Sequence, residues 1–335
     1  MKLKILLRLS IIGMFGLTGV NATEKPAAQI TPKLPAVDGE RCKSVAFACP
    51  RTGTIVIDGK LSEPDWKKAV AFSNFNNPGE VSGKQPVKFS YRILYDENYV
   101  YFGLETTLNG VESVCRQIIA NPLPSPKNIG DPRQDRYSSR YSMEIFLAPP
   151  HGASPYFQYV YSMDGYRYDG NASPENAGTW NGVWQAASHV AGNTWSMEFK
   201  FDVRSMGVER IAEFSEWRYN LVQNRSNAAV VAIGDIANFH VVSAFAELIM
   251  GDYAQWRRKV LTDAENSLKV LNNSGEFSAS RLDSIKQFMD EQRKSGAAGF
   301  KSGTEIEANY QQLNYLKEAI RQLENESAYR KLEAK

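Results

Sequence analysis

The stretch "IVIDGKLSEPDWKKAVAF", residues 55–72, raises the first question about function because it places three carboxylates within eight residues. It is expected to begin as a strand, to turn at an Asp-Gly pair, and to enter a short helix centred on Trp66. Acidic side chains in such places cap free N–H groups, and Pro64 suits the first helical turn. The open alternative is a structural calcium ion, because hard cations prefer clustered oxygen ligands. The three carboxylates belong to Asp58, Glu63 and Asp65.

Composition describes a chain with a substantial buried core and almost no net charge. The 335 residues are 43% hydrophobic, and 39 basic residues nearly balance 37 acidic ones. That balance predicts no nucleic-acid partner and favours partners recognised by shape and stacking. Aromatic residues make up 11% of the chain, and such rings either fill cores or stack on ligands.

The N-terminal segment has the pattern of a signal peptide. Residues 1–22 carry two lysines before a short apolar run and end in small residues. We therefore expect an exported protein, whether periplasmic, cell-surface or secreted, that begins at Thr23. Residues 23–50 repeat proline without a sustained period and are expected to form an extended linker. No later segment is predicted to span a membrane.

Export would place the cysteines in an oxidising compartment, which favours disulfides. Cys42 and Cys49 are predicted to pair, and pairing of Cys115 with either of them is the alternative. The three histidines are scattered and give no metal-ligand spacing with the cysteines. No cofactor is predicted beyond the calcium alternative.

Period-two alternation dominates the middle of the chain. In residues 87–95, Phe89, Tyr91 and Ile93 share one face, while Lys88 and Ser90 share the other. Many short strands of this kind predict an antiparallel β-sandwich, immunoglobulin-like or jelly-roll in type, over residues 51–251. The expected strands cover residues 87–95, 99–106, 141–148, 156–162, 184–190, 194–201, 216–223 and 245–250.

After Gly251 the apolar period changes to that of helices, so residues 252–335 are predicted to be a C-terminal α-helical extension of the sandwich. Three apolar stripes are expected, and the last is close to a coiled-coil seam. This appendage either packs on itself and on the sandwich, or offers a seam for self-association. The stripes run through Tyr253, Trp256, Val260, Ala264, Leu268 and Leu271, then Leu282, Ile285 and Met289, then Ile306, Tyr310, Leu313, Leu316, Ile320 and Leu323.

Searches for catalytic motifs find no nucleophile elbow, P-loop, zinc-protease helix or dinucleotide fingerprint. A glycosidase pair of carboxylates remains open among several acidic residues. Glu144 alternates with apolar neighbours inside a strand, which favours a paired structural carboxylate. The sequence therefore predicts no enzyme, and any hydrolase activity is expected in a partner.

The ordered motifs resemble carbohydrate-binding module family 9 over residues 52–251. The resemblance rests on "IVIDGKLSEPDWKKA", "ILYDENYVYFGLE", "SMEIFLAP", "WNGVWQAASHVAGNTWSMEFKF", "WRYNLVQNR" and "FHVVSAFAELIMG". It implies a sugar-binding β-sandwich that occurs beside glycan-degrading enzymes or in stand-alone exported proteins. It also implies that Trp66 is a core anchor. One departure is Arg140-Tyr141, where members often carry an acidic pair.

The leading hypothesis is an exported, non-catalytic protein that binds a poly- or oligosaccharide and supports glycan degradation beside a degrading enzyme. Aromatic rings would stack on sugar rings, while amide and guanidinium groups would bind hydroxyls. The rival hypotheses are a haem-binding electron-transfer sandwich and a structural or assembly protein that works through its helices. Trp180 is the first candidate for stacking, because it follows a polar loop. The candidate ligand-binding residues are Trp180, Trp184, Tyr166, Tyr168, Asn224 and Arg225.

Overall fold

The computed structural model describes a mainly β protein with a helical C-terminal extension, which confirms the predicted fold class. The described residues are 44–73, 75, 88–107, 141–163, 165–172, 180–225, 228–233, 240–296 and 299–333. The strands are β1 (Val45–Pro50), β2 (Phe89–Tyr95), β3 (Tyr99–Thr107), β4 (Ser142–Ala148), β5 (Phe157–Ser162), β6 (Arg167–Asn171), β7 (Trp184–Ala191), β8 (Thr194–Asp202), β9 (Glu216–Arg225), β10 (Ala228–Ala232) and β11 (Ala246–Met250). The helices are α1 (Pro64–Lys68), α3 (Tyr253–Ser274), α4 (Ala279–Ser295) and α5 (Gly303–Glu333), with 3-10 turns η1 (Val203–Met206) and η2 (Val242–Ala244).

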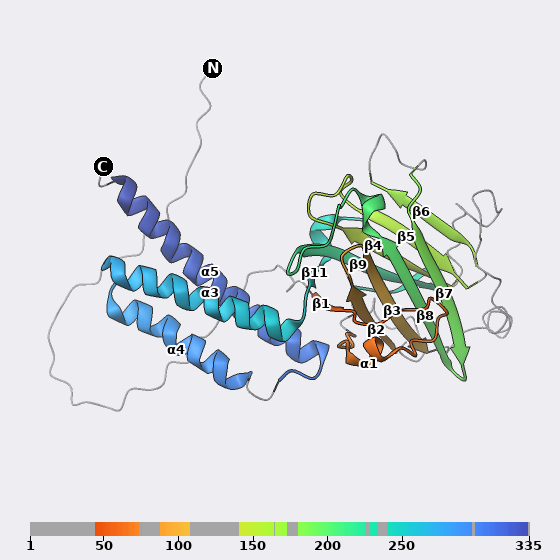
Figure 1. The fold of residues 1–335 in the computed structure, drawn as a ribbon, viewed down its shortest axis with the longest axis horizontal. Helices are drawn as coiled ribbons and strands as arrows, with labels where there is room; N and C mark the ends of the chain where they lie inside the picture. The colour runs from red at the N-terminus through yellow and green to blue at the C-terminus, as the bar shows by residue number, and fades with distance from the viewer. Residues whose placement is uncertain are drawn as a thin grey trace, which may run out of the picture. The chain divides into compact units, whose positions relative to one another are not determined.

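The strands form two sheets that share β1 (Figure 1). Sheet A has the order β6-β5-β4-β9-β11-β1, with β10 beside β9, and sheet B has the order β1-β2-β3-β8-β7. The first four residues of β1 pair with β11, and its last two pair with β2. Both of these pairings are parallel, whereas the other strand pairs of the described residues are antiparallel.

The two sheets face each other across an aromatic core. The hydroxyl groups of Tyr91 in β2 and Tyr219 in β9 are hydrogen-bonded to each other between the sheets. The rings of Tyr159 in β5 and Phe201 in β8 lie 4.4 Å apart between their centroids. Such direct contacts between inner faces are the packing of a β-sandwich.

Hydrogen bonds hold the loop formed by residues 55–72 against sheet B, and this loop does not form an active site. The carboxylate of Glu198 in β8 accepts hydrogen bonds from the backbone N–H groups of Asp58 (2.9 Å) and Gly59 (2.7 Å) and from the indole of Trp66 (2.8 Å). Burial raises the pKa of Glu198, and these three donors partly offset that rise. Trp66 is 1% exposed, so its predicted role as a core anchor is confirmed.

Asp65 closes the same loop from the other side. Its carboxylate accepts from the backbone N–H groups of Thr52 and Gly53, both at 2.7 Å, and from the Thr52 hydroxyl at 2.7 Å. Burial alone would raise the pKa of Asp65, but these donors outweigh burial and hold that pKa well below its ordinary value. Pro64 occupies the first turn of α1, as predicted, and Glu63 is the N-cap residue without a side-chain cap bond.

Three sequence expectations need correction. The strand expected at the start of residues 55–72 does not form, because those backbone groups bind Glu198 and Glu63 instead of a neighbouring strand. Residues 45–50, expected in the extended linker, form β1 at the junction of both sheets. The sequence analysis also missed β6 and β10.

The C-terminal helices lie side by side and share one hydrophobic core with the strands (Figure 1). The predicted apolar stripe of α5 is buried within the chain. This agrees with the alternative in which the helices pack on one another and on the sandwich. Phe47 of β1 meets the rings of Tyr253, Trp256 and Tyr310 at centroid distances of 4.9, 5.3 and 6.0 Å. Polar contacts support this junction, since Tyr310 donates to Glu247 at 2.5 Å.

A buried polar cluster joins the three helices to one another. The Arg257 guanidinium of α3 donates to the side chain of Asn309 in α5 (3.1 Å) and to the backbone carbonyl of Gln292 in α4. Tyr253 donates to the same Asn309 oxygen at 2.6 Å. Because Gln292 lies in the last turn of α4, the negative end of that helix dipole balances the buried guanidinium.

Candidate functional site

The candidate site is the outer face of sheet A, which points away from sheet B. Met143, Ile145 and Leu147 of β4 enter the core between the sheets, so the alternate residues of β4 point outward. Strand register then aligns the outward residues of β4, β5, β6 and β9 in rows. The rows are Ser162, Ser142 and Asn224; Tyr168, Val160, Glu144 and Val222; and Gly170, Gln158, Phe146 and Asn220. Tyr168 and Gln158 are partly exposed, whereas the other residues of these rows are buried, so a ligand can reach the face only along β5 and β6.

One half of this face is polar and centres on a buried carboxylate. Glu144 accepts a hydrogen bond from the side-chain amide of Gln158 at 2.7 Å and from that of Asn224 at 2.6 Å. A carboxylate accepts only, so both amides must turn their NH₂ groups toward it. The Gln158 side chain is therefore oriented by Glu144, and its amide oxygen faces away from that carboxylate. This oxygen can accept a hydrogen bond from a hydroxyl.

The other half of the face is aromatic. Tyr156, directly before β5, rests on Phe146 and Phe245, with ring centroids 5.7 and 5.8 Å away. Its hydroxyl is 2.8 Å from Nδ1 of His240, whose ring also meets Phe146 edge-on at 5.3 Å. His240 is exposed and Tyr156 is half-buried, so both reach the surface at this end of the face.

The structure brings three of the predicted ligand-binding residues to this face. Tyr168 and Asn224 lie on it by register, and Tyr166 lies beside it at the turn between β5 and β6, where its backbone carbonyl accepts from Ser162 at 3.1 Å. Both tyrosines are half-buried. Asn224 is only 4% exposed, and its side-chain amide donates to Glu144 and to Ser142. The side chain of Arg225 is outside the described residues.

The two predicted tryptophans lie elsewhere. Trp184 is buried in β7, where its indole donates to Asp169 at 3.1 Å and the Arg167 guanidinium lies 3.9 Å from its ring centroid. Trp180 is half-buried, packs on Phe157 at 4.8 Å and donates to the Ser205 carbonyl at 3.2 Å. Its stacking role stays a prediction.

The sequence analysis missed Gln158, Tyr156 and His240. The first two could have been found, because they alternate with the core residues Phe157 and Tyr159. His240 precedes η2 outside any regular pattern, so only the fold brings it to Tyr156.

The cysteine and metal expectations remain largely untested. Cys49 forms no disulfide with another residue of the described ranges, and burial raises the pKa of its thiol. Cys42 and Cys115 lie outside the described residues, so the Cys42–Cys49 disulfide stays a prediction. Within the described ranges, no group of three His, Cys, Asp or Glu residues is arranged to hold a metal ion. In that same part of the chain, no helix combines the length and apolar character needed to cross a bilayer.

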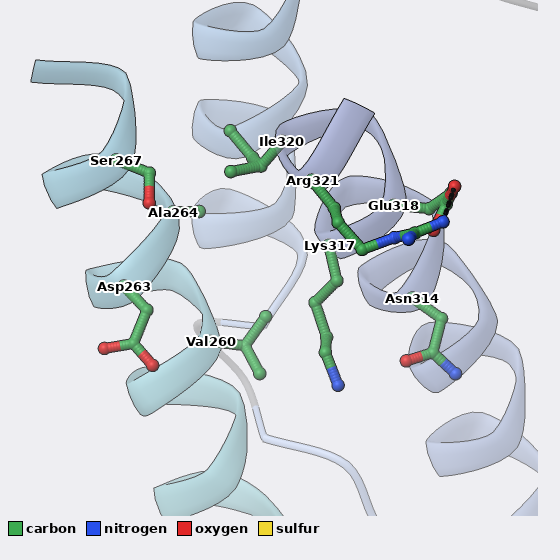
Figure 2. Close-up of a pocket in the computed structure, with 9 residues that line it drawn as sticks. All are labelled: Val260, Asp263, Ala264, Ser267, Asn314, Lys317, Glu318, Ile320 and Arg321. Atoms are coloured by element: carbon green, nitrogen blue, oxygen red, sulfur yellow. Dashed lines mark hydrogen bonds and ion pairs between the residues drawn. The ribbon is translucent and has the colours of Figure 1, made fainter. Parts of the chain in front are cut away.

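A groove of about 560 Å³ lies between α3 and α5 (Figure 2). Val260, Ala264 and Ile320 line it with little exposed surface. Its charged groups are paired within the chain: Asp263 with Lys259 at 2.6 Å, Glu318 with Arg321 at 2.8 Å, and Lys317 with Glu216 at 3.5 Å. The groove therefore offers an ionic ligand no uncompensated charge, and self-association through these helices stays a prediction.

Comparison with known proteins gives matches only among solved structures. No family model and no curated protein matches the chain. A carbohydrate binding module family 9 from Caldicellulosiruptor kristjanssonii in complex with cellotriose is similar at 15% identity and a TM-score of 0.40, over 62% of this chain and 94% of that one. The same kind of module in complex with glucose is similar at 14% identity and a TM-score of 0.40, over 62% and 95%.

A third solved structure, from Bacteroides uniformis ATCC 8492, is similar at 11% identity and a TM-score of 0.42, over 62% of this chain and 99% of that one. Two of these three structures are carbohydrate binding modules of family 9. At these identities and TM-scores, the three structures assign neither a ligand nor a site residue to this chain.

Proposed function

We propose that this chain is a non-catalytic carbohydrate-binding protein that holds a poly- or oligosaccharide along β5 and β6, at the partly exposed edge of the outer face of sheet A. The observation that carries the proposal is the register of β4, β5, β6 and β9, which joins half-buried tyrosines and an oriented amide on one face. A sugar ring presents both an apolar C–H face and hydroxyl groups. Tyr166 and Tyr168 supply surface for the first, and Gln158 supplies hydrogen bonds for the second.

Glu144 supports binding rather than hydrolysis. Glycoside hydrolysis ordinarily needs two carboxyl groups that flank the bond to be cleaved. Among the outward residues in the described rows of the face, Glu144 is the single carboxylate, and both of its oxygens accept amide hydrogen bonds. It is also fully buried, so it is a positioning group for Gln158 and not a general acid.

The proposed setting is outside the cytoplasm. Cleavage of residues 1–22 would release the chain to the compartment where polysaccharides occur, next to a glycan-degrading enzyme. Mass spectrometry of exported protein should give a chain that begins at Thr23. Recovery of an intact Met1 from the exported fraction would reject this part of the proposal.

A glycan array on the protein, followed by calorimetry with the best ligand, tests the function. Tyr168→Ala should weaken binding by about 2 kcal/mol, roughly thirtyfold, because it removes a stacking ring. Tyr329→Ala is the matched control, since Tyr329 is 62% exposed on α5, away from the face. Equal affinities for Tyr168→Ala and the unaltered chain would refute this site.

A further inference from the structure

Tyr168 lies across Gly170 instead of standing up from the sheet. A Cβ atom added to Gly170 would lie 2.7 Å from the Tyr168 hydroxyl oxygen, 3.2 Å from Cζ and 3.3 Å from Cε1. Side chains of strands usually stand roughly perpendicular to the sheet, so this ring is tilted along β6 toward the glycine. The ring is half-buried, so part of it remains accessible to a ligand.

Backbone conformation does not explain why residue 170 is a glycine. Gly170 is not among the residues with a positive φ, so other side chains could adopt its conformation. A glycine inside a strand usually costs stability and marks a place where another group approaches closely. Here that group is the Tyr168 ring, which makes Gly170 a positioning residue for the ring.

The aromatic surface continues from Tyr168 toward Tyr156. Gln158 is the register partner of Gly170, and Tyr156 is the next outward residue, about 6.7 Å farther along β5. Burial raises the pKa of Tyr156, and Tyr168 adds to that rise, which fits two phenol groups in proximity. Phe146, Phe245 and His240 hold the Tyr156 ring in place.

We infer that Gly170 lays Tyr168 flat as one stacking subsite and that Tyr156 with His240 forms a second, so that the ligand is a glycan that places at least two consecutive sugar rings on this face. The inference rests on the proposed function. Gln158 lies between the two subsites and would bind a hydroxyl near the linkage. The ligand class is a glycan chain rather than a single sugar.

The test compares affinities of variants for a monosaccharide and for the matching oligosaccharide. Gly170→Ala should lower affinity for both by about tenfold, because the new methyl group displaces the ring. The contact is with the far end of a flexible side chain, so the melting temperature should stay close to that of the unaltered chain. Tyr168→Phe should keep most of the affinity, since it keeps the ring.

A double variant separates positioning from a general structural effect. In a Tyr168→Ala background, Gly170→Ala should change affinity by less than about twofold, because the ring on which it acts is gone. Tyr156→Ala should weaken oligosaccharide binding more than monosaccharide binding, because only the longer ligand contacts both stacking rings at once.

The outcomes distinguish the inference from the function. If the unaltered chain binds no glycan, the proposed function fails. If the unaltered chain binds glycan and the Gly170→Ala variant binds it with the same affinity, the positioning role of Gly170 is overturned while the function stands. The positioning role is also overturned if Gly170→Ala weakens binding by the same factor with and without the Tyr168 ring. If Tyr156→Ala lowers affinity for the monosaccharide as much as for the oligosaccharide, the two-ring assignment is overturned.

Discussion

Trp66 and Trp195 are equally buried indoles whose N–H groups have different surroundings. Each is 1% exposed, but Trp66 donates to Glu198 at 2.8 Å, whereas the Trp195 N–H has no acceptor within the described part of the chain. Both substitutions to Phe remove the same atoms. Trp66→Phe should therefore destabilise the protein by about 1.5 to 3 kcal/mol more than Trp195→Phe, because it leaves Glu198 short of a donor. Urea unfolding of both variants measures the difference in their free energies of unfolding. Equal losses of free energy would contradict the stabilising role of the Trp66–Glu198 hydrogen bond.

Asp65 links stability to pH. Hydrogen bonds outweigh burial and hold the pKa of Asp65 well below its ordinary value. The ionised carboxylate therefore contributes its full stabilisation of the folded state above the unfolded pKa of about 3.9, and this stabilisation is lost as pH falls below that value. Asp65→Asn should cost about 2 to 3 kcal/mol at pH 7 and progressively less below pH of about 3.9. Asp263→Asn is the control, because it removes an ion pair between two exposed side chains, Asp263 and Lys259, and should cost at most about 0.5 kcal/mol. A penalty for Asp65→Asn that is constant with pH would contradict the assignment.

The candidate site shows what sequence can and cannot locate at the residue scale. Tyr166 and Tyr168 could be named in advance because they occur in the polar, glycine-bearing segment DGYRYDG, although the strand that contains Tyr168 was not predicted. The sequence did not separate them from Trp180 and Trp184, because an aromatic ring in a strand can face either side until register is known. Trp184 faces Asp169 inside the sandwich, whereas Tyr168 lies on the outer face.

At the scale of elements, the alternation of residue types along the sequence predicted most of the strands. The expected range 194–201 agrees with β8 (Thr194–Asp202), and 99–106 agrees with β3 (Tyr99–Thr107). β1 was missed because Val45, Ala46, Phe47 and Ala48 are all buried, so its sequence does not alternate. Its partners lie far away in the sequence, and no local pattern reveals them.

Two turn glycines should respond very differently to substitution. Gly59 has φ +86°, and a Cβ there would lie 2.4 Å from the backbone carbonyl carbon of Ser188. Backbone cannot yield as a side chain can, so Gly59→Ala should cost about 4 kcal/mol or more and displace the loop from Glu198. Gly192 has φ +59° and nothing within 4 Å, so Gly192→Ala should cost only about 1 to 2 kcal/mol. Thermal unfolding compares the stability of the two variants. Similar losses of stability would show that the backbone near Ser188 moves away to accommodate the new methyl group at residue 59.

At the scale of the whole molecule, the change of period at Gly251 does not separate two cores. The sequence analysis treated residues 252–335 as an appendage, but one hydrophobic cluster runs from the sandwich into α3, α4 and α5. Ser44 and the backbone N–H of Val45 donate to Glu307 at 2.6 and 3.2 Å, which fixes the start of β1 against α5. Because β1 also joins sheets A and B, the helices support the strand on which both sheets depend.

A chain that ends at Gly251 should therefore lose its cooperative fold. Phe47 is 5% exposed and would lose its contacts with Tyr253, Trp256 and Tyr310. Exposing each large apolar side chain costs about 1.5 to 3 kcal/mol, and whole domains are stable by only about 5 to 15 kcal/mol. Size-exclusion chromatography and calorimetry should show aggregation or a broad, weak transition. Removal of residues 332–335 is the control, because Leu332 is 70% exposed and its loss should leave the melting temperature nearly unchanged. A sharp transition near that of the full chain after truncation at Gly251 would show instead that the sandwich folds independently of its helices.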